Sequence, residues 1–503
     1  MAGNILPIAN TIQLWPNKRL VSNLYQDDTN MRESAYRTLN RQNYSSGFSG
    51  RSMGSTSIEL KFNKDSIVNH VLVQFTIKFG PNPDDTLSMG VGLEAGWAWK
   101  LVRRHVMQYS GSQSLEILGI DNYIRCMAEC ESVQKRNQLI ELGGSAVYRN
   151  EAGTIIGLDS EGNAKGSILL YTPHSSVSGA KQVGFDCSQC NSSPLIRLDL
   201  ASPSEVYTNL SASQDPTPLT NITYTSEMTS VEGMFYVGET AMIDTANSRR
   251  DMVGPSGPSQ SLMFFAYPGH FDAIVKKNAN NTTNPAPQVI GDVDLGDITI
   301  NQFINGSCQY LLIAVQRLDY LDSYGPNIAP DNRPNNMAKG AFNNFLRVSK
   351  MKITYGGGNT IYETDEIGVA ELIDLVVNPV DSSFDVRTFR RLAQTGADAT
   401  AAYPAEQVVG KSYFYRIQLS QFSELYKMFS LLQTGANLGS DNLKLSLTVK
   451  DSLQVAGTGK EIRYRVNVQQ VYQTSMTVAR GNVKWDYVNP SPQALPAQLQ
   501  VST

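Results

Sequence analysis

Apolar and polar residues alternate along much of the chain. In the stretch 71–79 every odd position is apolar, and the same period of two recurs at 58–62, 413–419, 443–449 and 462–468. Successive side chains of a strand point to opposite faces, so this period places the apolar residues on one face. The pattern predicts a protein built mainly of strands that are buried on one side.

Helical spacing is rare by comparison. Residues 121–142 begin at a plausible cap, Asp121, and predict one helix. A second helix is predicted over 421–433, where apolar residues form one stripe between Ser420 and Gly435.

The order of these elements repeats along the chain. Tyr109 opens a Gly-containing hairpin after the basic-studded strand 101–108, and Tyr355 does the same after 346–354. The two tyrosines lie 246 positions apart. An internal repeat this long indicates duplication of a whole domain.

Three more landmarks recur in the same order, two after these tyrosines and one before them. Lys165 and Lys411 each head a strand at the same offset of 246, and Val71–Val73 matches Leu311–Ile313 at an offset of 240. The alternating residues from Ile196 match those from Leu443, at an offset of 247. The junction between the two halves is predicted in the Gly/Pro-rich stretch 251–259.

Both ends of the chain have a different composition. Residues 1–50 are mostly polar with scattered arginines, which predicts an extended arm that orders only against another surface. Residues 489–503 contain three prolines and no charge, and are predicted to form a tail.

Three segments carry a resemblance to a known family. They are the hairpin Tyr109–Glu116, the strand–excursion–strand segment Tyr413–Val449 and the terminal strand Tyr464–Tyr472. In this order they resemble parts of the double jelly-roll major capsid proteins of double-stranded DNA viruses, the lineage of adenoviruses, giant viruses and tailless phages. The resemblance covers roughly residues 55–485 as architecture.

The resemblance implies an all-β fold of two tandem eight-stranded jelly-roll β-sandwiches, with a few short helices in loop excursions. The domains expected are an arm at 1–50, a first jelly roll at 51–250, a linker at 251–259, a second jelly roll at 260–488 and a tail at 489–503.

The same resemblance implies a structural role. A major capsid protein of this family forms a homotrimer, a pseudo-hexagonal capsomer that tiles an icosahedral virion shell. Implied partners are neighbouring capsomers, minor capsid or penton proteins and, through the N-terminal arm, an inner membrane. The implied location is the virion, after synthesis in the host cytoplasm.

Charge and hydropathy indicate which partners and locations fit this structural role. The 503 residues carry a net charge of −4, from 42 basic and 46 acidic residues. Proteins that coat nucleic acid carry a basic surplus, so direct genome binding is not expected. No apolar run approaches the roughly 20 residues of a membrane span, and Met1–Asn4 does not begin a signal peptide.

Two short segments match catalytic sequence motifs but lack the secondary structure that those motifs require. Residues 405–412 resemble a phosphate-binding loop, but Ala405 replaces its first glycine and a strand follows where a helix is required. Residues 50–54 match G-x-S-x-G without a preceding buried strand. His70 and His105 lie in strand patterns that favour a hydrogen-bonded histidine over a catalyst. We therefore expect no enzyme activity and no cofactor.

The cysteines suggest one metal hypothesis. Cys126 and Cys130 would share a helix face, and Cys187 and Cys190 form a C-x-x-C pair. Four thiolates could bind zinc, but the gap between the pairs is wider than in compact zinc modules, and cysteine is commonly an apolar core residue. We therefore expect no metal site. If there is one, the four cysteines are the candidates for binding zinc.

Two other functions remain open. The first is a glycan-binding or glycan-cleaving β-sandwich, for which Trp97 and Trp99 could share one strand face as part of an aromatic platform. The second is a minor virion or receptor-binding protein built from the same sandwich.

Overall fold

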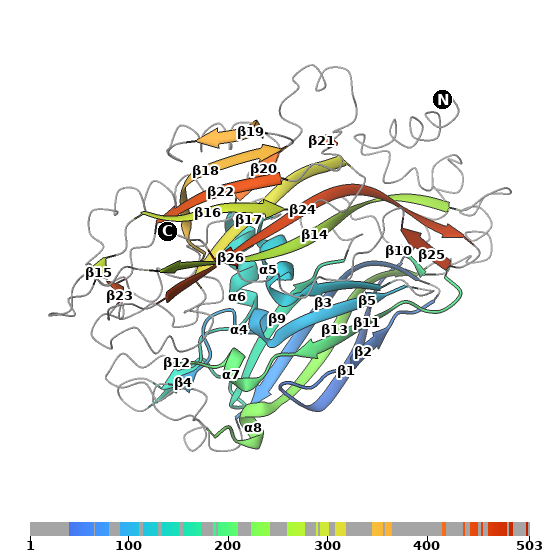
Figure 1. Cartoon of the computed structure of the whole chain (residues 1–503). Coiled ribbons are helices and arrows are strands. Elements are labelled where there is room, and N and C mark those ends of the chain that lie inside the picture. Colours follow the sequence, from blue (N-terminus) through green and yellow to red (C-terminus); the bar gives the residue numbers. More distant parts are fainter. Residues whose placement is uncertain are drawn as a thin grey trace.

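The computed structural model describes about half of the chain, in segments separated by gaps. The described residues are 40–64, 66–79, 91–109, 114–128, 133–149, 154–172, 185–187, 190–209, 223–241, 259–276, 288–289, 292–300, 307–317, 345–355, 358–364, 415–418, 436–437, 443–450, 454–455, 461–479, 482–485 and 499–500. They form two β-sandwiches with a small group of helices between them (Figure 1).

The first sandwich pairs a five-stranded sheet with a four-stranded one. The five-stranded sheet contains β1 (Asn40–Ser52), β13 (Ser230–Ala241), β3 (Ser66–Lys78), β9 (Asn163–Leu170) and β10 (Phe185–Asp186). The four-stranded sheet contains β2 (Ile58–Lys61), β11 (Leu195–Leu200), β5 (Val102–Gln108) and β6 (Ser114–Leu118). Smaller elements at its edges are β4 (Val91–Gly92) with β12 (Thr208–Asn209), β7 (Tyr148–Arg149) with β8 (Ile155–Ile156), and the short helices α7 (Pro203–Val206) and α8 (Ser226–Thr229).

The second sandwich is built from the later strands. Its larger sheet contains β20 (Tyr415–Gln418), β17 (Ser307–Arg317), β24 (Glu461–Ala479), β14 (Ser259–Lys276) and β26 (Leu499–Gln500), with β21 (Ala436–Asn437) on β17 and β25 (Asn482–Trp485) on β24. Its smaller sheet contains β16 (Asp292–Ile300), β22 (Leu443–Lys450), β18 (Arg347–Tyr355) and β19 (Asn359–Thr364), and β15 (Gln288–Val289) pairs with β23 (Gln454–Val455).

The two sandwiches have the same strand order. The four-stranded sheets run β2-β11-β5-β6 and β16-β22-β18-β19, and the larger sheets share the order β1-β13-β3-β9 and β14-β24-β17-β20. Every neighbouring pair in these two series is antiparallel. The predicted all-β fold and the predicted duplication are both present in this topology.

Two β-bulges also recur at equivalent positions. Arg103 of β5 and Ser349 of β18 each lack a partner on the next strand, and they lie 246 residues apart. Asn69 of β3 and Gln309 of β17 are skipped in the same way, 240 residues apart. A bulge bends its strand and interrupts the ladder at one point. Its recurrence therefore fixes the alignment of the halves residue by residue, at the offsets that the sequence indicates.

One offset differs from the prediction by two residues. Met107 pairs with Ile196, and its counterpart Ile353 pairs with Leu445, so β11 and β22 are 249 positions apart and not 247. Because side chains in a strand alternate with a period of two, this shift leaves the same residues facing the core.

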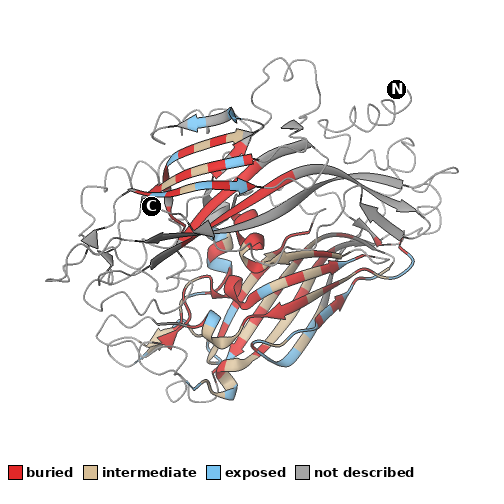
Figure 2. Cartoon of the chain, viewed as in Figure 1, coloured by how far each residue is buried: buried red, intermediate tan, exposed pale blue. Residues whose placement is uncertain are grey.

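Alternating burial confirms the period-two pattern. Along β3 the odd positions 71–77 are fully buried while the even ones are half-buried or exposed, and β22 alternates in the same way (Figure 2). The buried face of each strand packs in the interior of its sandwich, where apolar surface is removed from water.

In each sandwich a buried polar side chain links the two sheets. In the first, His105 of β5 is fully buried and its Nε2 lies 2.9 Å from the carbonyl oxygen of Tyr171, the residue after β9. In the second, the hydroxyl of Tyr415 on β20 accepts from the N–H of Val348 on β18, at 2.7 Å. The strands joined in the first sandwich, β5 and β9, correspond to β18 and β20 in the second. The linking side chain lies in the smaller sheet in the first sandwich and in the larger sheet in the second.

Several boundaries differ from the sequence-based expectation. Residues 40–50 belong to β1, which pairs with β13 along its length, so the arm prediction is wrong for these residues. Their serines and glycines show no apolar alternation, so the sequence pattern did not predict a strand here. Residues 1–39 and the junction 251–258 lie outside the described residues.

The helices of the structure also differ from those predicted from the sequence. Residues 121–142 form two helices, α5 (Gly119–Ala128) and α6 (Val133–Leu142), and the stretch 421–433 lies outside the described residues. Trp97 and Trp99 lie in a short helix, α4 (Trp97–Leu101), and not on a strand. Gly96, at φ 78°, turns the chain into this helix, and both indoles are buried. No helix in the described part of the chain is long and apolar enough to cross a membrane.

The buried histidine makes the stability of the first sandwich depend on pH. Burial lowers the pKa of His105 from 6.5 to about 4. Between these values the unfolded chain binds a proton that the folded chain does not, so stability falls as pH falls through this window. The shift corresponds to about 3 kcal/mol. His105→Gln, whose amide can still donate to Tyr171, should remove this loss. Urea unfolding at pH 7 and pH 4 measures it.

The matched control is His70→Gln on β3. If His105→Gln loses as much stability as the unmodified chain between pH 7 and pH 4, the assignment of the pH dependence to His105 is wrong.

Candidate functional site between the two sandwiches

Helix α5 lies between the two sandwiches and contacts both (Figure 1). Residues Asp121–Met127 are all buried, on every side of the helix (Figure 2). A helix buried on all sides is usually apolar all round, but this one carries an aspartate, an asparagine and an arginine. Each buried polar group needs a partner, so the contacts of these side chains determine where the helix can lie.

Asn122 attaches the helix to the edge of the first sandwich. Its Nδ2 donates to the carbonyl of Leu169 at 3.0 Å, and its Oδ1 accepts from the N–H of Tyr171 at 2.6 Å. These are the donor and acceptor that a neighbouring strand would supply to β9. The amide of one side chain thus replaces a strand and closes this sheet edge.

Two further residues hold the same edge. The thiol of Cys126 donates to the carbonyl of Leu169 at 3.7 Å, and the guanidinium carbon of Arg125 lies 4.2 Å from the ring centre of Tyr171. A cation over an aromatic face is attracted by the ring quadrupole, more strongly where water is excluded. Both side chains are buried, so these contacts lie in the interior of the molecule.

The other side of α5 contacts the second sandwich. The ring of Tyr123 stacks on that of Phe345, with centroids 6.1 Å apart and planes inclined by 13°. Nε2 of Gln469 on β24 donates to the carbonyl oxygen of Asp121 at 3.0 Å. Tyr123 also meets Trp99 edge-on at 5.4 Å, which connects this contact to α4.

The strands beneath α5 are buried on both faces. Residues 311–316 of β17 and 466–471 of β24 are buried without alternation. One face packs in the core of the second sandwich, and the opposite face of β17 is in contact with α5. This explains why Leu311–Val315 is a continuous apolar run, the pattern of a strand covered on both sides.

A glycine permits the close approach of α5 to β5. A Cβ added to Gly119 would lie 1.9 Å from the carbonyl oxygen of Val102. That atom belongs to the backbone and cannot move aside as a flexible side chain can. Gly119 therefore lets the helix begin directly over the strand.

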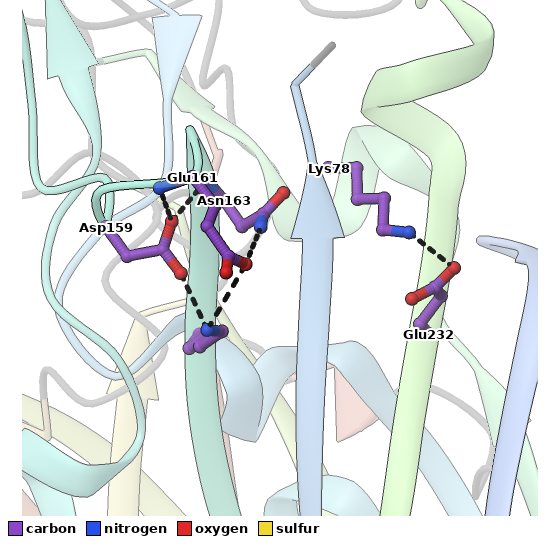
Figure 3. Close-up of polar contacts among 6 residues, drawn as sticks. Lys78, Asp159, Glu161, Asn163 and Glu232 are labelled. Atoms are coloured by element: carbon purple, nitrogen blue, oxygen red, sulfur yellow. Dashed lines mark hydrogen bonds and ion pairs between the residues drawn. The ribbon is translucent and has the colours of Figure 1, made fainter. Parts of the chain in front are cut away.

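A second group of charged residues lies at one end of the five-stranded sheet (Figure 3). Oδ1 of Asp159 accepts from the backbone N–H groups of Glu161 and Asn163, each at 2.9 Å, and Oδ2 lies 2.8 Å from Nζ of Lys165. The hydrogen bond from Lys165 is the main cause that lowers the pKa of Asp159. On the neighbouring strands Lys78 and Glu232 form a second ion pair, at 2.7 Å. The Asp159 contacts hold the turn that leads into β9, and the Lys78–Glu232 pair joins β3 to β13. Exposed ion pairs of this kind contribute little to stability.

The structure separates the zinc candidates. Cys126 lies against Leu169, which pairs with Leu72, whereas Cys187 follows Asp186, which pairs with Ile67. Five residues of strand span about 16 Å. One zinc ion binds each of its sulfurs at about 2.3 Å and cannot hold thiolates so far apart. Cys130 lies outside the described residues, and within them no three metal-binding side chains form a group.

The other candidates for chemistry occupy structural positions or are not described. His105 is the hydrogen-bonded core histidine that its strand pattern predicts. Ser52, in the G-x-S-x-G match, is exposed at the end of β1 and is followed by a turn and β2, not by a helix. The phosphate-loop match at 405–412 lies outside the described residues. The buried Trp97 and Trp99 offer no exposed aromatic platform.

Sequence reasoning missed the residues that join the sandwiches. Asn122, Tyr123 and Gln469 belong to no motif, and only their three-dimensional contacts reveal their role. One signal was available: the loss of alternation at Leu311–Val315, compared with the alternating match at Val71–Ile77, indicates a second covered face.

The strand order defines the class of fold. Two sandwiches, each of two facing sheets with the same order and the same bulges, make the chain a double jelly roll.

Solved structures agree with this class. A PBCV-1 virus capsid chain aligns with a TM-score of 0.53 and 12% identity over 90% of this chain and 98% of its own. PBCV-1 VP54 aligns at 0.50 with 11% identity over the same shares. The mavirus major capsid protein aligns at 0.48 with 10% identity, over 93% and 94%. No protein-family model and no curated sequence matches the chain. At these identities the likeness to the PBCV-1 chains establishes the fold.

The amide of Asn122 should be required for stability. Asn122→Ala leaves a buried carbonyl and a buried N–H without their partner, which should lower the free energy of unfolding by about 2 to 5 kcal/mol. Asn163→Ala, at the partly exposed turn near Lys165, is the matched control and should cost less than about 1 kcal/mol. Chemical denaturation of both variants tests this, and equal losses would contradict the role of Asn122.

The ring contact between the sandwiches should appear as a coupling energy. In a double-mutant cycle of Tyr123→Leu and Phe345→Leu, we expect a coupling of about 0.5 to 1.5 kcal/mol between the two positions. Denaturant unfolding of the four proteins measures it. Additive losses would mean that the rings do not stabilise each other.

The separation of the cysteines makes a further prediction. Elemental analysis of purified protein should find no stoichiometric zinc, because Cys126 lies far from Cys187 and Cys190. One zinc ion per chain would require an arrangement of thiolates other than the one described.

Proposed function

We propose that this chain is the major capsid protein of a double-stranded DNA virus and builds the shell of the virion. The observation that carries the proposal is the pair of jelly rolls with one strand order, joined by the buried helix α5. The likeness to chains from the PBCV-1 capsid supports it, since those chains have the same fold over 98% of their length.

The construction suits a building block of a shell. A subunit that tiles a surface needs a fixed shape, because small changes of angle accumulate over many copies. Here the angle between the sandwiches is held by buried hydrogen bonds and stacked rings, which have few alternative arrangements.

We propose that three copies form the capsomer. Two similar sandwiches per chain give six in a trimer, which makes a block with pseudo-sixfold symmetry suited to hexagonal packing. Neighbouring capsomers are the first partners, and minor capsid or penton proteins fill the remaining positions. The polar residues 1–39 are proposed to contact such a partner or an inner membrane. The net charge of −4 favours indirect contact with the genome.

We propose no catalytic role, and the virion is the proposed location, after synthesis in the host cytoplasm. A glycan-binding sandwich is the alternative class, and the burial of Trp97 and Trp99 removes the aromatic platform proposed for it. A minor virion or receptor-binding protein remains the closer alternative. Abundance distinguishes it, because the shell protein dominates the protein content of purified particles.

Native mass and imaging test the proposed assembly. Purified protein should have three times the 55.3 kDa mass of the chain, and negative-stain images should show particles with a hexagonal outline. A monomer that binds sugars on a glycan array would contradict the capsid proposal. A trimer that is scarce in purified particles would favour the minor virion protein.

The N-terminal segment can be tested separately. Because β1 begins at Asn40, deletion of residues 1–39 leaves the first sheet complete. Trimers should persist while assembly into shells is lost. The matched control is an equally long linker of glycine and serine in place of residues 1–39, which should behave like the deletion. Loss of the trimer itself would contradict this division of roles.

A further inference from the structure

Two cysteines lie where the chain crosses between the sheets of the first sandwich. Cys187 follows β10 in the five-stranded sheet, and Cys190 precedes β11 in the four-stranded sheet. Both side chains are buried, with relative exposures of 0% and 2%, and no disulfide joins them in this structure. The hypothesis of a four-cysteine zinc site does not account for them, because the β3 positions beside Cys126 and Cys187 are separated by five residues of strand, about 16 Å.

The backbone brings the two cysteines together. The N–H of Cys190 donates to the carbonyl of Cys187 at 3.1 Å, a hydrogen bond of the kind that closes a β-turn. The Cα atoms at the ends of such a turn lie within about 7 Å of each other. A disulfide requires a Cα separation of about 4.4 to 6.8 Å, so the turn places the pair in the range where a bond can form with little movement of the backbone.

We propose that Cys187 and Cys190 are a redox site that closes to a disulfide when the protein meets an oxidising environment. The bond joins the end of one sheet to the start of the other. The segment that follows is already fixed, because the N–H of Phe62 donates to the carbonyl of Pro194 at 2.9 Å and Nζ of Lys64 donates to that of Asn191 at 3.3 Å. Oxidation would add a covalent bond just before this segment.

The chemistry is thiol–disulfide exchange with a small disulfide such as oxidised glutathione. One cysteine loses its proton and its thiolate attacks a sulfur of the oxidant, which releases one molecule of reduced glutathione and forms a mixed disulfide. The second thiolate then attacks the protein sulfur of that bond and releases the second glutathione. The two protein thiols are oxidised by two electrons and one glutathione disulfide is reduced. Because both thiols are buried, the exchange takes place when the segment beside the exposed Asn191 and Ser192 opens transiently.

This inference does not depend on the capsid proposal, because it concerns one turn of the folded chain. It would hold equally for a glycan-binding or minor virion protein of this fold. The two proposals can therefore fail separately.

The full-length protein is equilibrated in defined mixtures of reduced and oxidised glutathione, and its free thiols are then blocked with N-ethylmaleimide. Intact mass should show five blocked cysteines under reducing conditions and three after oxidation, and peptide mapping should place the bond between Cys187 and Cys190. The melting temperature should rise by roughly 4 to 8 °C on oxidation and return on reduction, as a four-residue loop in a domain of this size implies.

Matched variants assign the effect. Cys187→Ser and Cys190→Ser should each abolish the oxidised species and the rise in melting temperature, whereas Cys126→Ser, whose hydroxyl can still donate to Leu169, should keep both. If the serine variants do not fold, the peptide map of the unmodified protein still decides the question. Five blocked thiols under full oxidation, a bond mapped elsewhere, or zinc bound to the pair would overturn the proposal.

Discussion

The rest of the architecture depends on the complete burial of helix α5. A buried helix with three polar or charged side chains is stable only if each of them finds a partner, and the partners come from different sandwiches. Asn122 bonds to the main chain of the first sandwich. Nε2 of Gln469 in the second sandwich donates to the main-chain carbonyl of Asp121 at 3.0 Å and lies 3.5 Å from its side-chain Oδ1. The relative position of the sandwiches is therefore set by hydrogen bonds that a rotation would break, and not by apolar contact alone, which is non-directional.

The two halves share their backbone more closely than their side chains. Both bulges recur at Arg103 and Ser349 and at Asn69 and Gln309, because a bulge sets the bend of a strand and every neighbouring strand depends on it. The polar link across each core follows a different rule. One half uses a histidine and the other a tyrosine from the opposite sheet, since the interior requires only that the buried group be satisfied.

The sequence was sufficient for the strands and the duplication, because a period of two and an offset near 246 are properties of the chain itself. It failed where burial comes from another part of the molecule. The stretch Asp121–Met127 looks like a half-exposed helix, and nothing local indicates that both sandwiches cover it. β1 was missed because its serines and glycines show no alternation. Trp97 and Trp99 fit the period of a strand as well as the short helix that Gly96 begins, and spacing alone could not decide between them.

The outward-facing residues of β3 and of its counterpart β17 explain why α5 belongs to the first half of the chain but packs on the sheet of the second half. On β3 of the first sandwich this face has Leu72, Gln74 and Thr76, which are all half-buried; their counterparts 240 residues later are Leu312, Ala314 and Gln316, which are all buried. Tyr236, whose hydroxyl donates to Gln74 in the first half, corresponds in the pairing register to Gln469, the donor to Asp121. The face that satisfies its own polar groups in the first half is, in the second half, a face whose Gln469 donates to α5. α5 supplies that partner, so neither sandwich alone determines the shape of the whole, and the repeat loses its symmetry at the surface where its two copies meet.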